Sequence, residues 1–190
     1  MKIIVCGAGS VGRSIVSYLI KGNNDIIVID NNQKALDDLA QEFDILPVLG
    51  SASHPEVLEK ADAAKARLLI AATNVDEVNM VACQVAHSVF NVPRKIARID
   101  AQDFLEPLWA TLYNEKSLPI DLIISPEIEI GRYIYHMLKI PGASEVLPLF
   151  DGKMQLLGFK MPEESPLIKV PLLNLGQVSE DINVEVVCVN

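Results

Sequence analysis

Two textures of hydrophobic and polar positions alternate along the chain: short, continuously apolar runs, and longer segments in which apolar residues recur at helical spacing. The strand-like runs are residues 2–6, 25–30, 45–49, 67–73, 95–100 and 121–125. The intervening segments predict a helix that begins near Gly12 and further helices at 32–42, 53–61, 76–90, 103–113 and 127–139, with Asp103 as an N-cap. Continuously apolar strands suit a parallel sheet that helices cover on both faces. The pattern therefore predicts an α/β fold, a Rossmann-like doubly wound sheet of six parallel strands in the order 3-2-1-4-5-6.

The pattern changes after Ile140. The stretch "DGKMQLLGFKM" predicts a strand after an Asp-Gly turn, "PEESPLIKVPLLNL" a short connecting helix, and "NVEVVCVN" one more strand. We expect one domain over residues 1–140 and, over 141–190, the start of a small α+β domain that is cut short.

Composition narrows the class of protein. A chain of 190 residues that is 50% hydrophobic can bury a real core, while its net charge of -9 argues against binding to nucleic acid. No apolar stretch approaches the roughly 20 residues of a membrane helix, and the chain opens on a strand rather than a leader peptide, so we expect a cytosolic protein. Cys6, Cys83 and Cys188 are expected to be small buried residues rather than a disulfide framework or a metal knuckle.

The segment "VCGAGSVGRSI" carries the strongest chemical signal. Gly7, Gly9 and Gly12 form a G-x-G-x-x-G motif that follows a strand and opens a helix. In such a motif the first glycine makes a tight turn, the second lets a pyrophosphate approach the backbone, and the third lets the helix pack on the strand. The free N–H groups at the start of the helix then bind phosphate. The alternative is that the three glycines only form a tight turn and bind no ligand.

Asp30 ends the next strand, 18 positions beyond Gly12. A carboxylate there can accept hydrogen bonds from both ribose hydroxyls and repels a 2′-phosphate, and no arginine follows it, so NAD is favoured over NADP. An ordinary helix cap is the alternative for Asp30.

Residues at the carboxyl ends of three further strands belong to the same predicted crevice. Gly50 and Ser51 follow the third strand, Thr73 and Asn74 follow the fourth, and ordinary capping is the alternative for Ser51 and Asn74. Arg98 lies in the strand-like run "KIARID", and a buried guanidinium is costly unless it is paired. We expect Arg98 near the carboxyl tip of its strand, facing phosphates or a carboxylate such as Asp100.

No constellation of catalytic residues accompanies the crevice. His54, His87 and His136 each fit a structural role, and neither a Tyr-x-x-x-Lys pair nor a Walker A lysine stands out. A binding module without chemistry is therefore favoured. The alternative is a fragment of an NAD-dependent oxidoreductase whose catalytic domain lies elsewhere.

Three stretches together resemble the RCK/KTN family of nucleotide-gated regulatory domains, in particular the regulators of Trk potassium uptake: residues 1–32, "VLGSASHPEVLEKADAAKARLLIAATNVDEVNMVACQVA" and "IDLIISPEIEIGRYI". The segment "TNVDEVNM" is specific to that family. The similarity runs to about residue 140, and the remainder resembles the small domain that follows in the family.

The resemblance implies a site and a ligand. Residues Gly7, Ala8, Gly9, Ser10, Val11 and Gly12 would hold the phosphates of NAD(H) or ATP/ADP, Asp30 the ribose, Gly50, Ser51, Thr73 and Asn74 the crevice, and Arg98 the phosphates. Glu127 matches a position that in some relatives helps to hold a divalent cation, and no other metal ligand is expected. Many relatives have Gly-Asp where this chain has Gly50-Ser51.

The resemblance also implies partners. The module would sit peripherally on the cytoplasmic face of a bacterial or archaeal inner membrane and gate a Trk-type, TrkH-like potassium-transporting subunit. It would pair and form a ring of such domains. The helix that carries Ile128, Ile130, Ile134 and Met137 or Leu138 is the candidate dimer contact, and packing of that helix on its own sheet is the alternative.

Overall fold

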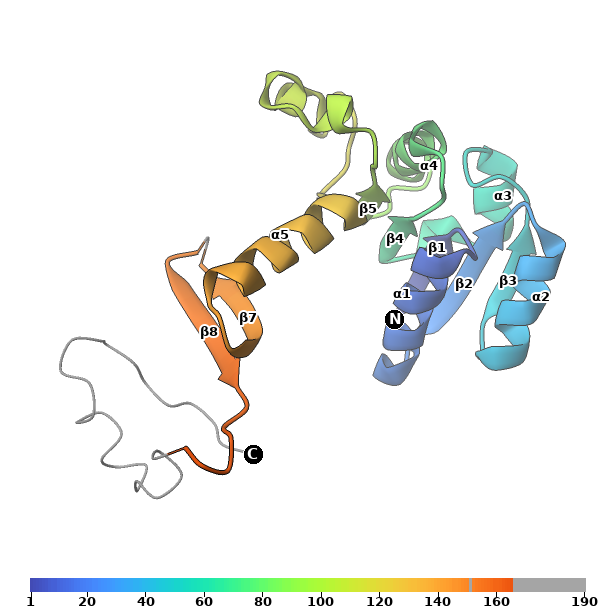
Figure 1. Cartoon of the computed structure of the whole chain (residues 1–190). Helices are drawn as coiled ribbons and strands as arrows, with labels where there is room; N and C mark the ends of the chain where they lie inside the picture. Colours follow the sequence, from blue (N-terminus) through green and yellow to red (C-terminus); the bar gives the residue numbers. More distant parts are fainter. Residues whose placement is uncertain (151, 166–190) are drawn as a thin grey trace. The chain divides into compact units, whose positions relative to one another are not determined.

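A six-stranded parallel sheet forms the first part of the computed structural model, which describes residues 1–150 and 152–165 (Figure 1). Its order is β3-β2-β1-β4-β5-β6, which confirms the predicted topology. The strands are β1 (Lys2–Cys6), β2 (Asp25–Asp30), β3 (Leu46–Leu49), β4 (Leu68–Ala71), β5 (Arg94–Arg98) and β6 (Leu122–Ile124).

α-Helices follow five of the six strands of the sheet, all except β5. They are α1 (Ser10–Leu19), α2 (Gln33–Glu42), α3 (Pro55–Lys60), α4 (Asp76–Ser88) and α5 (Pro126–Lys139), with short 3₁₀ turns η1 (Ile20–Gly22) and η2 (Ala63–Lys65). The first helix ends at a turn in which Asn23 takes the left-handed conformation, with φ 52°.

The helix predicted at 103–113 is wrong. Two 3₁₀ turns occupy that segment instead, η3 (Gln102–Leu105) and η4 (Pro107–Leu112). Pro107 is the cause: it has no N–H to give to a helix, and it holds the preceding Glu106 in an extended conformation, with ψ 141°. Asp103 is not an N-cap, because Ala101 precedes the first turn.

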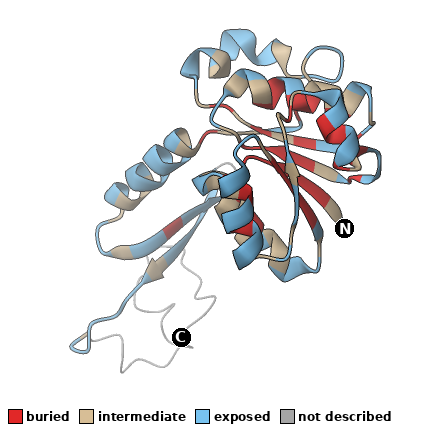
Figure 2. Ribbon diagram, turned by 90° about the vertical axis from the view of Figure 1, so that its right-hand side faces the viewer, coloured by how far each residue is buried: buried red, intermediate tan, exposed pale blue. Residues whose placement is uncertain are grey.

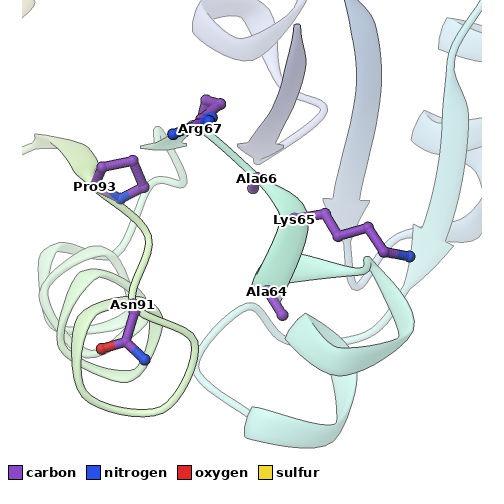
Figure 3. Close-up of a pocket in the computed structure, with 6 residues that line it drawn as sticks. All are labelled: Ala64, Lys65, Ala66, Arg67, Asn91 and Pro93. Carbon is purple, nitrogen blue, oxygen red and sulfur yellow. The ribbon is translucent and has the colours of Figure 1, made fainter.

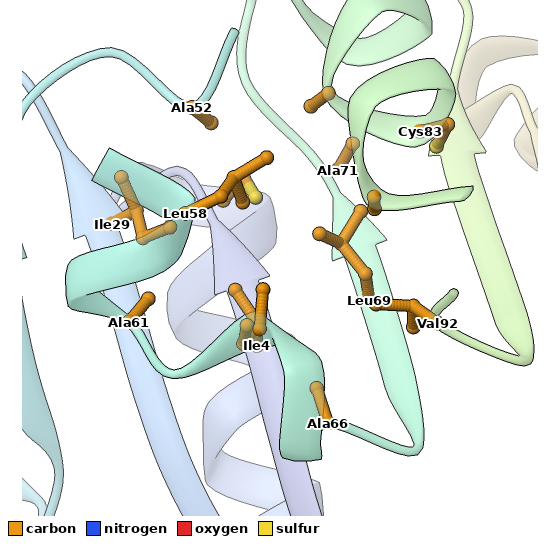
Figure 4. Close-up of a cluster of buried hydrophobic side chains, with 14 of the residues drawn as sticks. Ile4, Ile29, Ala52, Leu58, Ala61, Ala66, Leu69, Ala71, Cys83 and Val92 are labelled. Atoms are coloured by element: carbon orange, nitrogen blue, oxygen red, sulfur yellow. The ribbon is translucent and has the colours of Figure 1, made fainter. Parts of the chain in front are cut away.

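Two apolar layers make the core, one on each face of the sheet (Figure 2). On β1, Ile3 and Val5 pack with buried residues of α1 and α2, whereas Ile4 and Cys6 pack with those of α3 and α4. Figure 4 shows the second layer, where Leu58 and Cys83 lie over the strands. The strands are continuously apolar because their alternating side chains enter two cores.

The strand register aligns the carboxyl ends of the central strands. Cys6 pairs with Ile29 of β2 and with Ala71 of β4, and Ala71 pairs with Ala97 of β5. The residues that follow these four positions therefore emerge at one edge of the sheet, which we call the carboxyl edge.

The described residues divide into two compact units, the first Met1–Ile130 and the second beginning at Gly131, within α5. The second unit contains an antiparallel pair, β7 (Ala143–Leu149) and β8 (Met154–Phe159), and β8 is the strand predicted after the Asp-Gly turn. The domain boundary after residue 140 stays a prediction. The predicted final strand and most of the connecting helix lie outside the described residues. Among the residues that are described, no helix is long and apolar enough to span a membrane.

Candidate functional site

A cleft of about 390 Å³ opens at the carboxyl edge of the sheet. It brings together ten of the predicted site residues: Gly7, Gly9, Ser10, Val11, Asp30, Gly50, Ser51, Thr73, Asn74 and Arg98. Ala8 and Gly12 do not line it. Residues that the sequence reasoning missed complete the lining: Ile29, Asn31, Asn32, Ala35, Ala52, Ala72, Val75 and Val78. That a ligand uses these residues stays a prediction.

The glycine loop is shaped by contacts that only glycine permits. Gly7 has φ +110°, and a Cβ on it would lie 2.7 Å from the carbonyl oxygen of Ala72. At Gly12 a Cβ would lie 1.8 Å from the carbonyl oxygen of Gly7, so the start of α1 is pressed directly onto the loop. A Cβ on Gly9 would meet nothing within 4 Å, because that residue faces the open cleft. Gly7 and Gly12 are therefore required for close packing, and the open space at Gly9 is compatible with the approach of a phosphate, which stays a prediction.

The amino end of α1 is left open toward the cleft. Gly9 is its N-cap residue, no side chain caps the helix, and its first turn carries no acidic residue. The first N–H groups of a helix lack partners within the helix, and the helix dipole makes this end attractive to negative charge. Because Gly9, Ser10 and Val11 line the cleft, this end of α1 is suited to an anion such as a phosphate.

Asp30 joins the glycine loop to the end of β2. Its Oδ2 accepts a hydrogen bond from the backbone N of Ala8 at 2.6 Å, and its Oδ1 accepts one from the N of Asn32 at 2.8 Å. The cap of α2 is Asn32, whose side chain accepts from the N of Ala35, so Asp30 is not the helix cap. Each carboxylate oxygen has a further lone pair that can accept from a ligand hydroxyl.

Arg98 ends β5 at the cleft and is already paired. Its Nε donates to Oδ1 of Asp100 at 2.9 Å, its Nη2 lies 2.5 Å from Oδ2 of the same carboxylate, and 3.7 Å from Oε1 of Glu127. The hydrogen bond to Asp100 raises the pKa of the guanidinium above its ordinary value, with the charges of Asp100, Glu127 and Asp76 adding to the effect and desolvation opposing it. Arg98 is therefore held in place as a positive charge. It lines the cleft and also pairs with the local carboxylate of Asp100, as the sequence predicted.

The segment "TNVDEVNM" holds the ends of β4 and β5 in place. The side chain of Asn79 binds Thr73 and the carbonyl oxygen of Arg98. Asp76 accepts hydrogen bonds from the backbone N atoms of Asp100 and Ala101. Sequence reasoning missed Asn79 and Asp76. The available signal was an amide at a position of α4 that shares the buried face with Ala82 and Cys83.

The third strand contributes a shorter hydroxyl-lined turn. The backbone N of Gly50 donates to the carbonyl oxygen of Asp30 at 2.9 Å, and the hydroxyls of Ser51 and Ser53 lie 2.8 Å apart. Ser51 lines the cleft as a neutral residue. Among the described residues, Asp30 is the only carboxylate that lines the cleft.

Glu127 gains no metal-binding partners. It lies beside Arg98, and among residues 1–150 and 152–165 no group of three or more His, Cys, Asp or Glu side chains could hold a metal ion. A cation site around Glu127 therefore finds no support in this geometry.

A second cleft of about 300 Å³ lies at the other end of the strands, the amino edge of the sheet. Figure 3 shows its lining on the segments that lead into β4 and β5: Ala64, Lys65, Ala66, Arg67, Asn91 and Pro93. Lys65 forms an ion pair with Asp62 at 3.1 Å. No predicted site residue lies there.

The chain's relatives agree with this architecture. The model of the TrkA-N domain matches residues 3–126, so the chain belongs to the TrkA-N family, which confirms the resemblance seen in the sequence. The Trk system potassium uptake protein TrkA of Azorhizobium caulinodans is 41% identical over 190 residues, covering 100% of this chain and 42% of that protein. The chain thus spans less than half the length of this relative.

Solved structures show the same fold. The TrkA-N domain of the inner membrane protein YbaL from Escherichia coli superimposes with a TM-score of 0.61 at 22% identity, over 72% of this chain and 96% of that one. A GsuK channel bound to NAD gives a TM-score of 0.60 at 21% identity, over 79% of this chain and 25% of that one.

Proposed function

We propose that this chain is the nucleotide-sensing part of a regulator of potassium uptake, a binding module rather than an enzyme. One observation carries the proposal: a glycine loop, the uncapped amino end of α1 and the carboxylate of Asp30 line a single cleft. The pyrophosphate of a dinucleotide or the phosphates of ATP or ADP would lie on the helix terminus, and the ribose on Asp30.

The ligand is an adenosine nucleotide, NAD(H) or ATP/ADP. Asn31 and Asn32 follow Asp30 in the cleft. Among the described residues that line it, Arg98 of β5 is the only cation, and no cation follows Asp30 to accept a 2′-phosphate, so NADP is disfavoured. The GsuK structure that shares the fold holds NAD, which supports the same class of ligand here.

The regulated partner is a Trk-type potassium-transporting membrane subunit on whose cytoplasmic face the chain would bind. The relative of Azorhizobium caulinodans, a Trk system potassium uptake protein, supports this assignment. Regulation requires that the nucleotide binds the two states of the assembly with different affinities, because a ligand bound equally by both shifts nothing. A tenfold preference per site corresponds to about 1.4 kcal/mol, and several sites in a ring would add.

Self-association would use α5. Ile130, Ile134 and Leu138 are exposed by 60%, 51% and 75%, and no residue of α5 is buried. Apolar side chains spaced by four residues form one face of a helix, and an exposed apolar face of this kind is typical of a contact with another chain.

The test is calorimetric titration of the purified chain with NAD, NADH, ATP, ADP and NADP, together with its mass in solution with each ligand. Micromolar binding of adenosine nucleotides, weaker binding of NADP and a ligand-dependent assembly are expected. Binding of NAD(H) alone by an unchanging monomer would contradict a sensor and favour a fragment of an oxidoreductase.

A further inference from the structure

The buried amide of Asn79 connects two cleft residues that come from different strands. Its side chain is 0% exposed, and a buried amide is costly unless hydrogen bonds satisfy it. Oδ1 accepts from the N of Thr73 at 3.0 Å and from its Oγ1 at 2.7 Å. Nδ2 donates to the carbonyl oxygen of Thr73 at 3.0 Å and to that of Arg98 at 2.9 Å. All of these bonds end on residues that line the cleft.

These bonds begin where the strand pairing stops. The ladder between β4 and β5 ends at the pair Ala71 and Ala97, so the residues beyond it have no partner across the two strands. The amide of Asn79 spans that gap, since it binds the main chain of Thr73 on one side and of Arg98 on the other. It fixes the point at which both strands leave the sheet.

Asp76, one turn earlier on α4, fixes the next residues of the same loop. Its carboxylate accepts from the N of Asp100 at 3.0 Å and from the N of Ala101 at 2.8 Å. Asp100 in turn holds the guanidinium of Arg98. Asn79 therefore positions the main chain of Arg98, and Asp76 positions the main chain of Asp100, the carboxylate that pairs with Arg98.

We infer that Asn79 is a positioning residue for the ligand: it places Thr73 and Arg98 for contact with the phosphate portion of a nucleotide, without touching the ligand itself. This inference rests on the proposed function, because it takes an adenosine nucleotide as the occupant of the cleft. Asp76 contributes to the same positioning, because it binds the backbone of Asp100 and Ala101.

The variant Asn79→Asp tests it, because the new side chain has the same shape but presents an oxygen to the two carbonyls that Nδ2 binds. We expect the Kd for ADP to rise about three- to tenfold in protein that is folded by circular dichroism, and the Kd for adenosine, which has no phosphate, to change less than threefold. Asp76→Ala removes the carboxylate that binds the backbone of Asp100 and Ala101, and it should raise the Kd for ADP about threefold or more. Because Asp76 is not a core residue, this variant should leave the core intact.

Cys83→Ala is the matched control. Cys83 is also buried on α4, one turn further along, and its Sγ contacts the carbonyl oxygen of Ile96 in the middle of β5, away from the cleft. This variant should lower the melting temperature and leave the Kd for ADP unchanged. A purely structural role of Asn79 would make Asn79→Asp behave in the same way.

A double-mutant cycle separates the two roles further. If Asn79 acts through Arg98, then Asn79→Asp should weaken ADP binding less in an Arg98→Ala background than in the wild type. Unchanged affinity of folded Asn79→Asp and Asp76→Ala, with normal binding by the wild type, would overturn the inference alone. If the wild type binds neither ADP nor NAD, the proposed function falls and the inference with it.

Discussion

The two edges of the sheet carry clefts of similar size but different construction. The carboxyl-edge cleft measures about 390 Å³ and the amino-edge cleft about 300 Å³. At the carboxyl edge a glycine loop leads into the ten-residue helix α1, whose amino end is uncapped. At the amino edge the lining includes Lys65 and Arg67 beside a 3₁₀ turn of three residues. The volumes differ by less than a third, so the main difference between the two clefts is their backbone geometry.

Positive charge alone does not make the amino edge an anion site. Lys65 is already paired with Asp62, and mobile surface side chains lose conformational entropy when they bind a ligand. At the carboxyl edge the donors are backbone N–H groups that folding has already fixed. A preorganised helix terminus, with Arg98 held in the same cleft, is therefore better suited to phosphate than two exposed cations.

The largest expected effect comes from Gly12→Ala. The added Cβ would lie 1.8 Å from the carbonyl oxygen of Gly7, so either α1 or the glycine loop must move. Unfolding should become easier by about 3 kcal/mol or more, the upper range for overpacking, and nucleotide binding should be lost. Chemical denaturation and calorimetry measure the two effects.

Gly9→Ala is its matched control, because a Cβ there meets nothing within 4 Å. Its denaturation midpoint should equal that of the wild type while nucleotide affinity falls, since Gly9 lines the cleft. Equal stability of both variants would contradict the tight packing of Gly12 on Gly7.

The next effect is that of Asp30→Ala. Loss of the hydrogen bonds from the ribose to this carboxylate should weaken the binding of every adenosine ligand by about 10- to 100-fold, because hydrogen bonds to charged groups contribute about 1.5–3 kcal/mol. Calorimetric titration with NAD, ATP and ADP measures it. Arg67→Ala, at the amino edge, is the control and should bind as the wild type does; an equal loss in both variants would erase the distinction between the edges.

Arg98→Ala should have a smaller effect that depends on the ligand. Because Asp100 already occupies the guanidinium, a phosphate gains only part of the pairing energy, and the loss should grow with phosphate charge, from adenosine through ADP to ATP, up to about tenfold. Titration of the same variant with the three ligands reads out this order. A uniform loss for all three would assign Arg98 to holding the loop rather than to the phosphates.

The smallest effect at neutral pH concerns the core beneath the carboxyl edge. Burial raises the pKa of the Cys83 thiol to about 12 and that of Cys6, with the charge of Cys83 adding to it, still higher. Both should be protonated and inert to thiol reagents at pH 7 in the folded protein. Above pH 9.0, the ordinary value in the unfolded chain, only the unfolded thiols lose protons, so the free energy of unfolding should fall by up to about 1.4 kcal/mol per thiol and pH unit.

Denaturation at several pH values from 8 to 11 measures this slope. Cys83→Ala removes one thiol and should give a shallower decline than the wild type. An identical slope in the two proteins would show that the Cys83 thiol does not stay protonated in the fold.

The sequence was most informative where few residue types satisfy a backbone requirement. The glycine loop and the strand order followed from glycine spacing and from continuously apolar strands, because both patterns have direct local causes. The helix predicted at 103–113 was wrong because Pro107 interrupts helical hydrogen bonding within that segment, whatever the apolar spacing around it.

The cleft's supporting contacts could not be predicted in the same way. Asn79 binds Arg98, 19 positions away, and Asp76 binds the N atoms of residues 24 and 25 positions away, so their roles depend on how the strands come together. For Arg98 the sequence left phosphates and Asp100 both open, and the structure shows the carboxylate bound.

Binding of a nucleotide at the carboxyl edge can be tested by hydrogen exchange of the backbone amides with and without ADP or NAD, read by mass spectrometry of peptides from both edges. We expect added protection in peptides that contain Gly7–Val11 and Thr73–Asn74, and none in peptides that contain Ala64–Arg67 and Asn91–Pro93. Protection at the amino edge, or equal protection at both edges, would contradict this expectation.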